Sequence, residues 1–391
     1  MLPAATAEEG QITVQAPEPA GAPILYQREL PADADADSLR VEAGDTDLPR
    51  KVEWQRPNVR VSWRSTGAGT YVLRFTRGAA GGRMHQPEPA MIGTGDRVTY
   101  GRPGVRGKLS VGLWAHPAAI DLDQDGATDL IVGCPDHPSN GIYYFRNLGT
   151  NRKPLFARGE WMGPGKKDLV VADFNGDGKP DLVVSGGYYS DIRANRLSRF
   201  VAVPVVRSYH VGRDDLWYPV DWDGDGRIDL LVGASDWREY GWDDAYNAKG
   251  EWTHGPLHGY VWFHRNVGTN EAPRYAEPVR LEAGGRVLDQ YGSPAPNPVD
   301  WFGKGRLDLI AGSFLDTVTL YRNTGSRTAP QLAAGETLPF RMDICMIQPR
   351  VADWYGDGRV SLLVGEEDGR VSLVENTAGK GETPKLAPPR F

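Results

Sequence analysis

Cysteine is nearly absent from this chain of 391 residues, which has only Cys134 and Cys345. Two cysteines so far apart provide no disulfide framework. No apolar run approaches the roughly 20 residues that a membrane-spanning helix needs, so we expect no membrane partner. Basic residues are outnumbered by acidic ones. The resulting net charge of −7 argues against nucleic acid as a partner.

Several catalytic motifs are missing as well. The sequence contains no G-x-S-x-G, no H-E-x-x-H, no phosphate-binding P-loop and no C-x-x-C. Nor does a secretory apolar segment follow Met1. The catalytic classes that depend on those motifs are therefore not expected.

Glycine, proline and tryptophan are plentiful, with 48, 30 and 12 residues. Many turns and many aromatic side chains are typical of an all-β protein with several sheets. One stretch, DWDGDGRIDLLVG from Asp221, recurs in recognisable form with copies that begin at Asp121, Asp173, Asp300 and Asp353. The spacings between these starts are 52, 48, 79 and 53 residues, and a period near fifty indicates a repeat architecture.

Each copy is predicted to form a strand, a tight acidic turn and a second strand. Carboxylates at alternate positions, with glycine at the sharp bend, suit calcium, which takes six to eight oxygen ligands. The fourth and fifth copies have lost some of these carboxylates, so we expect calcium in the first three only. The predicted calcium ligands are Asp121, Asp123, Asp125, Asp129, Asp173, Asn175, Asp177, Asp181, Asp221, Asp223, Asp225 and Asp229.

These acidic copies resemble the FG-GAP repeats, also called VCBS repeats, of integrin-like β-propellers. The resemblance covers about residues 110–377 and implies a ring of blades with four antiparallel strands each. Residues 1–23 are predicted to be a partly disordered arm, and residues 24–391 a single β-propeller domain. Alternating runs between residues 24 and 100 suggest further blades without the motif, which leads to a prediction of seven blades in all.

A second repeated phrase, such as YYFRNLGT from Tyr143, is predicted to be the third strand of a blade and the turn into the fourth. Strands of a blade alternate in direction. All acidic turns should therefore lie on one face of the disc. The loops between second and third strands should lie on the other face.

Histidine, tyrosine, arginine and tryptophan gather in segments assigned to that second face. Functional residues concentrate on long loops held by a rigid scaffold. The long loop behind the 79-residue spacing supplies several of them. The candidates are His116, His137, Tyr188, Tyr189, Arg193, Arg196, Arg207, His210, Trp242, Tyr246, Trp252, His254 and His258.

Histidine, tyrosine and arginine together suit β-elimination on a uronic acid. Arginine neutralises the carboxylate, a base removes the C5 proton, and an acid protonates the leaving oxygen. The order of these residues is similar to that in seven-bladed ulvan lyases and related rhamnosyl-glucuronate lyases. That resemblance implies a polysaccharide lyase that cuts between rhamnose and O4 of glucuronate, with ulvan as the favoured substrate.

The same resemblance implies roles for individual residues. His116 and His137 would form the catalytic pair, Tyr188 or Tyr189 would be the acid/base, and Arg207 would neutralise the carboxylate. Tyr246 would contact the substrate, and Arg193 and Arg196 are alternatives to Arg207. From their place on the second face, Arg193, Arg196, His210, Trp242 and Trp252 are also expected to contact the polymer.

Other interpretations stay open at this stage. One is a non-catalytic carbohydrate-binding or adhesion propeller, and another is a rhamnosidase-type hydrolase that uses Glu239, Asp243 or Asp244. His254 and His258 are also candidate zinc ligands. Calcium turns favour a calcium-rich compartment, so we expect a secreted or periplasmic monomer whose export signal is missing from this sequence.

Overall fold

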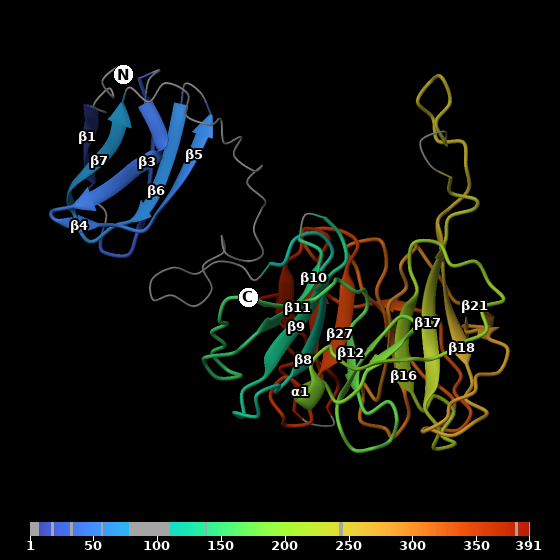
Figure 1. The fold of residues 1–391 in the computed structure, drawn as a ribbon. Coiled ribbons are helices and arrows are strands. Elements are labelled where there is room, and N and C mark those ends of the chain that lie inside the picture. Colours follow the sequence, from blue (N-terminus) through green and yellow to red (C-terminus); the bar gives the residue numbers. More distant parts are fainter. Residues whose placement is uncertain are drawn as a thin grey trace. The chain divides into compact units, whose positions relative to one another are not determined.

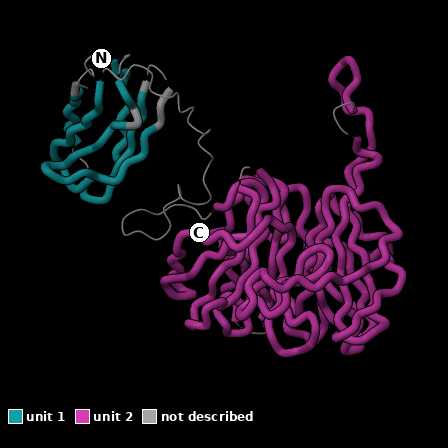
Figure 2. Tube along the Cα trace, in the orientation of Figure 1, with its two compact units in different colours: residues 1–91 teal, residues 92–391 magenta. Residues whose placement is uncertain are grey.

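The structure is a computed structural model that describes residues 8–16, 19–31, 34–55, 58–77, 110–137, 139–241, 245–379 and 382–390. It divides into two compact units, Met1–Met91 and Ile92–Phe391 (Figure 2). This division corrects the prediction of one propeller domain from residue 24 to residue 391. Among the described residues, no helix is both long and apolar enough to cross a membrane.

The first unit is a β-sandwich of two antiparallel sheets (blue in Figure 1). One sheet has the order β1-β7-β3-β4 and the other β2-β6-β5. The strands are β1 (Glu8–Ala16), β2 (Pro23–Glu29), β3 (Ala34–Ala43), β4 (Thr46–Asp47), β5 (Arg50–Gln55), β6 (Asn58–Arg64) and β7 (Gly69–Arg77).

Alternating apolar residues build the core of this unit. Val59 and Val61 on β6 and Leu73 on β7 are fully buried in one hydrophobic cluster. Residues with period-two alternation form strands in a sandwich as readily as in a blade, which is why the sequence pattern suggested extra blades. Part of the predicted arm is also ordered, because β1 pairs with β7 along its whole length. Residues 1–7 lie outside the described part.

The second unit is a β-propeller with five blades in its described residues (green to red in Figure 1). The inner strand of each blade comes first in sequence. Blades 1 and 2 consist of β8 (His116–Ile120), β9 (Asp129–Cys134), β10 (Gly141–Phe145) and β11 (Glu160–Gly163), then β12 (Val170–Ala172), β13 (Asp181–Val184), β14 (Gly187–Tyr189) and β15 (Phe200–Ala202), with the short helix α1 (Ile192–Asn195).

The remaining blades follow the same order. Blade 3 adds a fifth strand, β22, beside β18, and a small hairpin, β20–β21. The strands of blade 3 are β16 (Leu216–Val220), β17 (Asp229–Asp236), β18 (His258–His264), β19 (Val279–Arg280), β20 (Glu282–Ala283), β21 (Arg286–Val287) and β22 (Asp289–Gln290). Blade 4 consists of β23 (Pro296–Val299), β24 (Asp308–Ala311), β25 (Thr319–Tyr321) and β26 (Glu336–Thr337). Blade 5 consists of β27 (Gln348–Ala352), β28 (Ser361–Gly365) and β29 (Val371–Val374).

Hydrophobic clusters close the ring. Each pair of neighbouring blades shares one, and the pair formed by blades 5 and 1 is included. On β9, Leu130 and Val132 face blade 5 whereas Ile131 faces blade 2. Burying one such side chain contributes about 1.5–3 kcal/mol. The described ring is complete with five blades, which corrects the predicted seven.

Candidate functional site

The two faces of the propeller follow from strand direction. The inner and second strands of blades 1, 2, 3, 4 and 5 are antiparallel neighbours, and the acidic turns join them. We call the side of these turns the acidic-turn face. The opposite side, where the inner strands begin and the β17–β18 loop projects, is the loop face.

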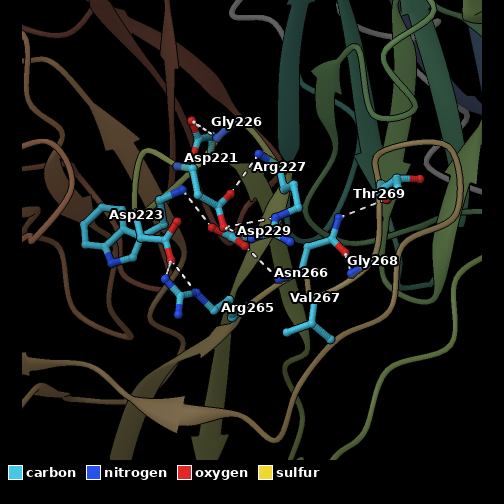
Figure 3. A network of polar contacts seen from close by, with 12 residues as sticks. Asp221, Asp223, Gly226, Arg227, Asp229, Arg265, Asn266, Val267, Gly268 and Thr269 are labelled. Carbon is cyan, nitrogen blue, oxygen red and sulfur yellow. Dashed lines mark hydrogen bonds and ion pairs between the residues drawn. The ribbon is translucent and has the colours of Figure 1, made fainter.

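The third acidic turn has the geometry of a cation site (Figure 3). Asp221 accepts backbone N–H bonds from Asp225 at 3.0 Å and from Gly226 at 3.2 Å. Ligand oxygens of Asp221, Asp223 and Asp225 lie within 4.8 Å of one another. Oδ1 of Asp223 is buried and has no protein partner. These residues therefore fit a calcium ion.

An arginine from the turn after β18 of the same blade contacts one of these carboxylates. Arg265 donates from Nε to Oδ2 of Asp223 at 2.5 Å, as Figure 3 shows. In blade 1, Arg146 does the same to Asp123, at 2.5 Å. A guanidinium and a calcium ion would compete for the same carboxylate charge.

The first two turns also keep ligand geometry. Asp121, Asp123 and Asp129 form a second close group of carboxylates. In blade 2, Asp173 accepts from the backbone N–H groups of Asp177 and Gly178, at 3.0 and 2.9 Å. The side chain of Asn175 points at Asp177.

The last aspartate of each motif has a further role. Asp229 accepts N–H bonds from Trp222 at 3.0 Å and Asn266 at 2.7 Å, so it joins the acidic turn to the turn after β18. Burial raises the pKa of Asp229 to about 7. Asp129 binds Leu122 and Asn147 in the same way. These carboxylates clamp two turns of a blade together.

The predicted catalytic residues do not form one site. His116 is buried at the start of β8, and its Nδ1 accepts the N–H of Asp168 at 3.0 Å. His137 is exposed in the β9–β10 loop. Tyr188 and Tyr189 are packed in β14. Tyr188 bonds the side chain of Asn175 in the acidic turn, and Tyr189 packs on Phe200.

The predicted arginines also have other partners. Arg193 donates to the carbonyl of Asp121 in the first acidic turn. Arg196 stacks on the ring of Tyr144, whose hydroxyl donates to Asp129. Both arginines therefore lie on the acidic-turn face. Arg207 is paired with Asp215 at 2.7 Å. The separation of Tyr188, Arg193 and Arg196 from His116 corrects the predicted grouping on one face. The reason is the short turn between β13 and β14, after which the chain runs back toward the acidic turns and carries these side chains with it.

The structure instead brings together the residues of the β17–β18 loop. They line an open pocket of about 380 Å³, formed by Tyr240, Tyr246, Trp252, His254, Gly255, Pro256 and Tyr291. We call it the loop pocket. Trp252 lies 4.5 Å from Tyr240 and 5.2 Å from Tyr246 between ring centroids. Trp242 lies outside the described residues.

One histidine lines the loop pocket, and a second lies at the base of the same loop. Nδ1 of His254 lies 3.2 Å from the Tyr240 carbonyl, which can only accept, so Nδ1 carries the proton and Nε2 of the neutral ring keeps its lone pair. His258 donates to Asp289 at 2.6 Å and lies 3.6 Å from Glu239. Burial opposes its protonation, but these two carboxylates outweigh burial and raise the pKa of His258. The two imidazoles have different partners, and the predicted zinc site stays a prediction.

A buried polar cluster at the propeller axis was missed by sequence reasoning. Arg350 of β27 forms an ion pair with Asp168, which precedes β12, across the ring from blade 5 to blade 2. Burial raises the pKa of Asp168 to about 6. Burial, together with Lys167 and Arg350, lowers the pKa of His116 well below its usual value. No motif marks these residues, and their only common signal is a position near the start of an inner strand.

Comparisons with known proteins agree with the repeats. A model of the FG-GAP-like repeat matches residues 121–184. Phosphatidylinositol-glycan-specific phospholipase D of Mus musculus is 29% identical over 154 residues, which is 31% of this chain. The match spans only 18% of that relative's length.

Two solved structures are similar in part. The GH43_1 enzyme from Xanthomonas citri, complexed with xylose, is 14% identical with a TM-score of 0.43, over 72% of this chain and 92% of that one. A TcdB2-TccC3-Cdc42 structure is 16% identical with a TM-score of 0.30, over 70% of this chain and 14% of that one. The strand topology defines the second unit as a β-propeller, and the FG-GAP-like repeat matches residues 121–184 within it.

Proposed function

We propose that the propeller binds a polysaccharide through the loop pocket. The observation that carries this proposal is the aromatic lining of the pocket, which comes from the β17–β18 loop and from Tyr291 after β22. Flat rings offer apolar surface to the C–H faces of sugars, and their hydroxyl and imidazole groups can bond the sugar hydroxyls. The volume of about 380 Å³ falls within the range of about 300–1,000 Å³ that small-ligand pockets occupy.

The exposure of the lining supports the same proposal. Tyr246 and Trp252 are 59% and 36% exposed, although both are large aromatic side chains. The hairpin that carries them is closed by a backbone bridge between these two residues. Exposed aromatic clusters on a rigid loop are typical of binding surfaces.

Binding can be tested with Trp252→Ala. Loss of one stacking ring should weaken binding of the polysaccharide by at least about tenfold, which corresponds to ~1.4 kcal/mol. Trp161→Ala is the matched control, because Trp161 is a 57% exposed tryptophan on β11 of blade 1. Affinity electrophoresis in gels that contain ulvan would measure both variants. Equal mobility of the wild type with and without polymer would contradict the proposal.

A polysaccharide lyase is the second candidate function. It would cleave between rhamnose and O4 of glucuronate, with ulvan favoured, and the tautomer of His254 supports it. In such a step Nε2 of His254 takes the C5 proton, the electron pair forms the C4–C5 double bond, and the C4–O4 bond breaks. The hydroxyl of Tyr240 then protonates O4. Arg207 is bound to Asp215, so the carboxylate would need another cation.

Product analysis separates the candidates. A lyase produces an unsaturated uronate that absorbs in the near ultraviolet, and His254→Ala should abolish this absorbance while the fold is kept. New reducing ends without absorbance would instead favour the hydrolase interpretation. Of the three carboxylates that a hydrolase could use, the structure describes Glu239, whose side chain is 68% exposed beside His258. Asp243 and Asp244 lie outside the described residues. Binding without either product would leave the carbohydrate-binding function alone.

Calcium is the proposed structural ion of this propeller. The buried, unpartnered Oδ1 of Asp223 and the two close carboxylate groups support it. The ion would hold the acidic turns and take no part in chemistry at the loop pocket, which belongs to the opposite face.

A further inference from the structure

Three side chains occupy equivalent places just before the inner strands of consecutive blades. Trp114 precedes β8 of blade 1, Lys167 precedes β12 of blade 2, and Arg213 precedes β16 of blade 3. Since inner strands start on the loop face, the three residues meet on that face.

Both cations lie against the same indole. The Nζ atom of Lys167 is 4.6 Å from the ring centroid of Trp114, and Cζ of Arg213 is 4.7 Å from it. The guanidinium of Arg213 also lies 5.5 Å from the ring of Trp237. Arg213 is exposed and stands between two indoles, which orients its planar group without burying it.

The backbone at Trp114 is strained. Its φ is 59°, a left-handed conformation that bulky residues rarely adopt. Its N–H is held by the Glu367 carbonyl of blade 5 at 2.8 Å. Strain of this kind persists where the surrounding structure fixes it, and such residues cluster at functional sites.

Lys167 and Arg213 bring two positive charges to this position. Lys167 donates to the Arg213 carbonyl at 2.6 Å and to the buried Asp214 at 3.4 Å. Asp168 beneath is paired with Arg350, and the carboxylate of Glu367 accepts from the Cys345 thiol.

An aromatic path joins this position to the loop pocket. Trp237, which contacts Arg213, lies 5.4 Å from Tyr240, and Tyr240 lines the pocket. Trp237 itself is buried, whereas Arg213 is exposed, so a polymer seated on Tyr240 can place a neighbouring unit at Arg213.

We propose that Trp114, Lys167 and Arg213 form a subsite for an acidic sugar unit, bearing a carboxylate or a sulfate, of the polysaccharide bound in the loop pocket. This proposal rests on the proposed polysaccharide binding. The edge of a stacked guanidinium offers paired N–H donors that match an anionic oxygen pair, and the indole offers apolar surface for the sugar ring.

The test compares Arg213→Gln/Lys167→Gln with the wild type on four forms of one polymer. The probes are ulvan, ulvan with its carboxyl groups reduced, desulfated ulvan, and ulvan with both groups removed. We expect the double variant to bind native ulvan at least about tenfold more weakly, because it loses charge-assisted hydrogen bonds. It should bind the doubly modified, neutral polymer as the wild type does. The singly modified polymers show whether the subsite recognises the carboxylate or the sulfate.

Two further variants make the test specific. Lys153→Gln/Arg274→Gln removes the same charge from exposed turns after the third strands of blades 1 and 3, on the acidic-turn face, and should leave all affinities unchanged. Arg213→Lys keeps the charge but not the planar fork, so its affinity for native ulvan should fall between those of the wild type and Arg213→Gln. Circular dichroism checks that each variant is folded.

The two proposals fail in different ways. If Trp252→Ala weakens binding of every polymer form while the Arg213/Lys167 variant changes none, the acidic subsite is wrong and the loop pocket stands. An equal loss on native and neutral polymer would also overturn the subsite. If the wild type binds none of the four forms, the proposed polysaccharide binding itself is wrong.

Discussion

At the scale of single residues, the axial ion pair between Arg350 and Asp168 is the most unusual arrangement. Both side chains are buried, and Oδ2 of Asp168, Nε of Arg350 and Nε2 of His116 have no protein partner. Breaking a buried pair by removing one member leaves an uncompensated charge and costs several kcal/mol. The pair joins blades that are not neighbours, so it contributes to holding the ring in one arrangement.

The stability of the propeller should depend on pH through Asp168. Its folded pKa is raised from 3.8 to about 6, so its contribution is fully present below pH 3.8 and is lost as the pH rises through 6. Asp168→Asn removes this dependence. Relative to the wild type, the variant should gain up to about 3 kcal/mol between pH 4 and pH 7.

Urea unfolding at pH 4, 5, 6 and 7 measures this difference. His116 contributes with the opposite sign in both proteins. Glu277→Gln, the same kind of change at an exposed site, is the control. Curves for Asp168→Asn and the wild type that run parallel over this range would show that the carboxyl is not perturbed.

At the scale of elements, the acidic turn is stabilised from within and from its neighbour. Backbone N–H groups bond Asp221 inside the turn, and Asp229 ties it to the turn after β18. Arg265 then sits on Asp223. The turn can thus hold its shape with a guanidinium where a calcium ion would also be attracted.

Removing Arg265 should tighten calcium binding. Arg265→Gln frees Asp223 from its ion pair, so we expect several-fold higher affinity in titration calorimetry, whereas Asp223→Asn should weaken binding. At a calcium concentration of 100 times the dissociation constant, one site stabilises by about 2.7 kcal/mol. Arg359→Gln, next to Asp357 in the fifth turn, is the matched control. Identical calcium responses of all four proteins would contradict calcium binding at the third turn.

The base of the β17–β18 loop should loosen as the pH rises. His258 connects Glu239, on the loop, with Asp289 of β22. Tyr260 stacks on His258, and Asp236 lies opposite it on β17. Two arginines stand behind these groups, with Arg238 paired to Asp236 and Arg280 over the ring of Tyr260. Because the folded pKa of His258 is raised above 6.5, the stabilisation is complete below pH 6.5 and is lost as the pH rises through the raised value.

Hydrogen exchange can follow this loosening directly. The N–H groups of Thr253 and Gly255 are bonded to Ala245 and Glu239 across the loop. Their protection, corrected for intrinsic rates, should decrease from pH 6 to pH 9 in the wild type and stay constant in His258→Gln. Protection that falls equally in both proteins would assign the pH effect to another group.

At the scale of the whole molecule, the two units have separate cores. The cluster that contains Val59 and Leu73 holds only residues of the sandwich, and each of the five propeller clusters holds only residues of the propeller. Differential scanning calorimetry of the full chain should therefore resolve two transitions. Calcium should raise only the transition of the propeller, and Val61→Ala should lower only the other, by several degrees. A single transition shifted by both changes would mean that the units unfold together.

The sequence alone determined the repeat, the propeller class and the acidic turns. These features are local: Asp221 bonds the N–H groups four and five residues further on, and the apolar run after it enters a buried strand. Short-range hydrogen bonds and alternation of burial can be predicted from the order of residues along the chain. The aromatic β17–β18 loop could also be found, because its length broke the repeat spacing.

Only the tertiary structure decided the number of blades and the grouping of side chains. Strands of residues 8–77 have the alternation of blade strands, and their pairing with one another, rather than any local signal, makes them a sandwich. The direction of Tyr188 depends on the register of β14, where a shift by one residue would reverse it. Arg350 and Asp168 are 182 residues apart, and closure of the ring is what brings their charges into contact.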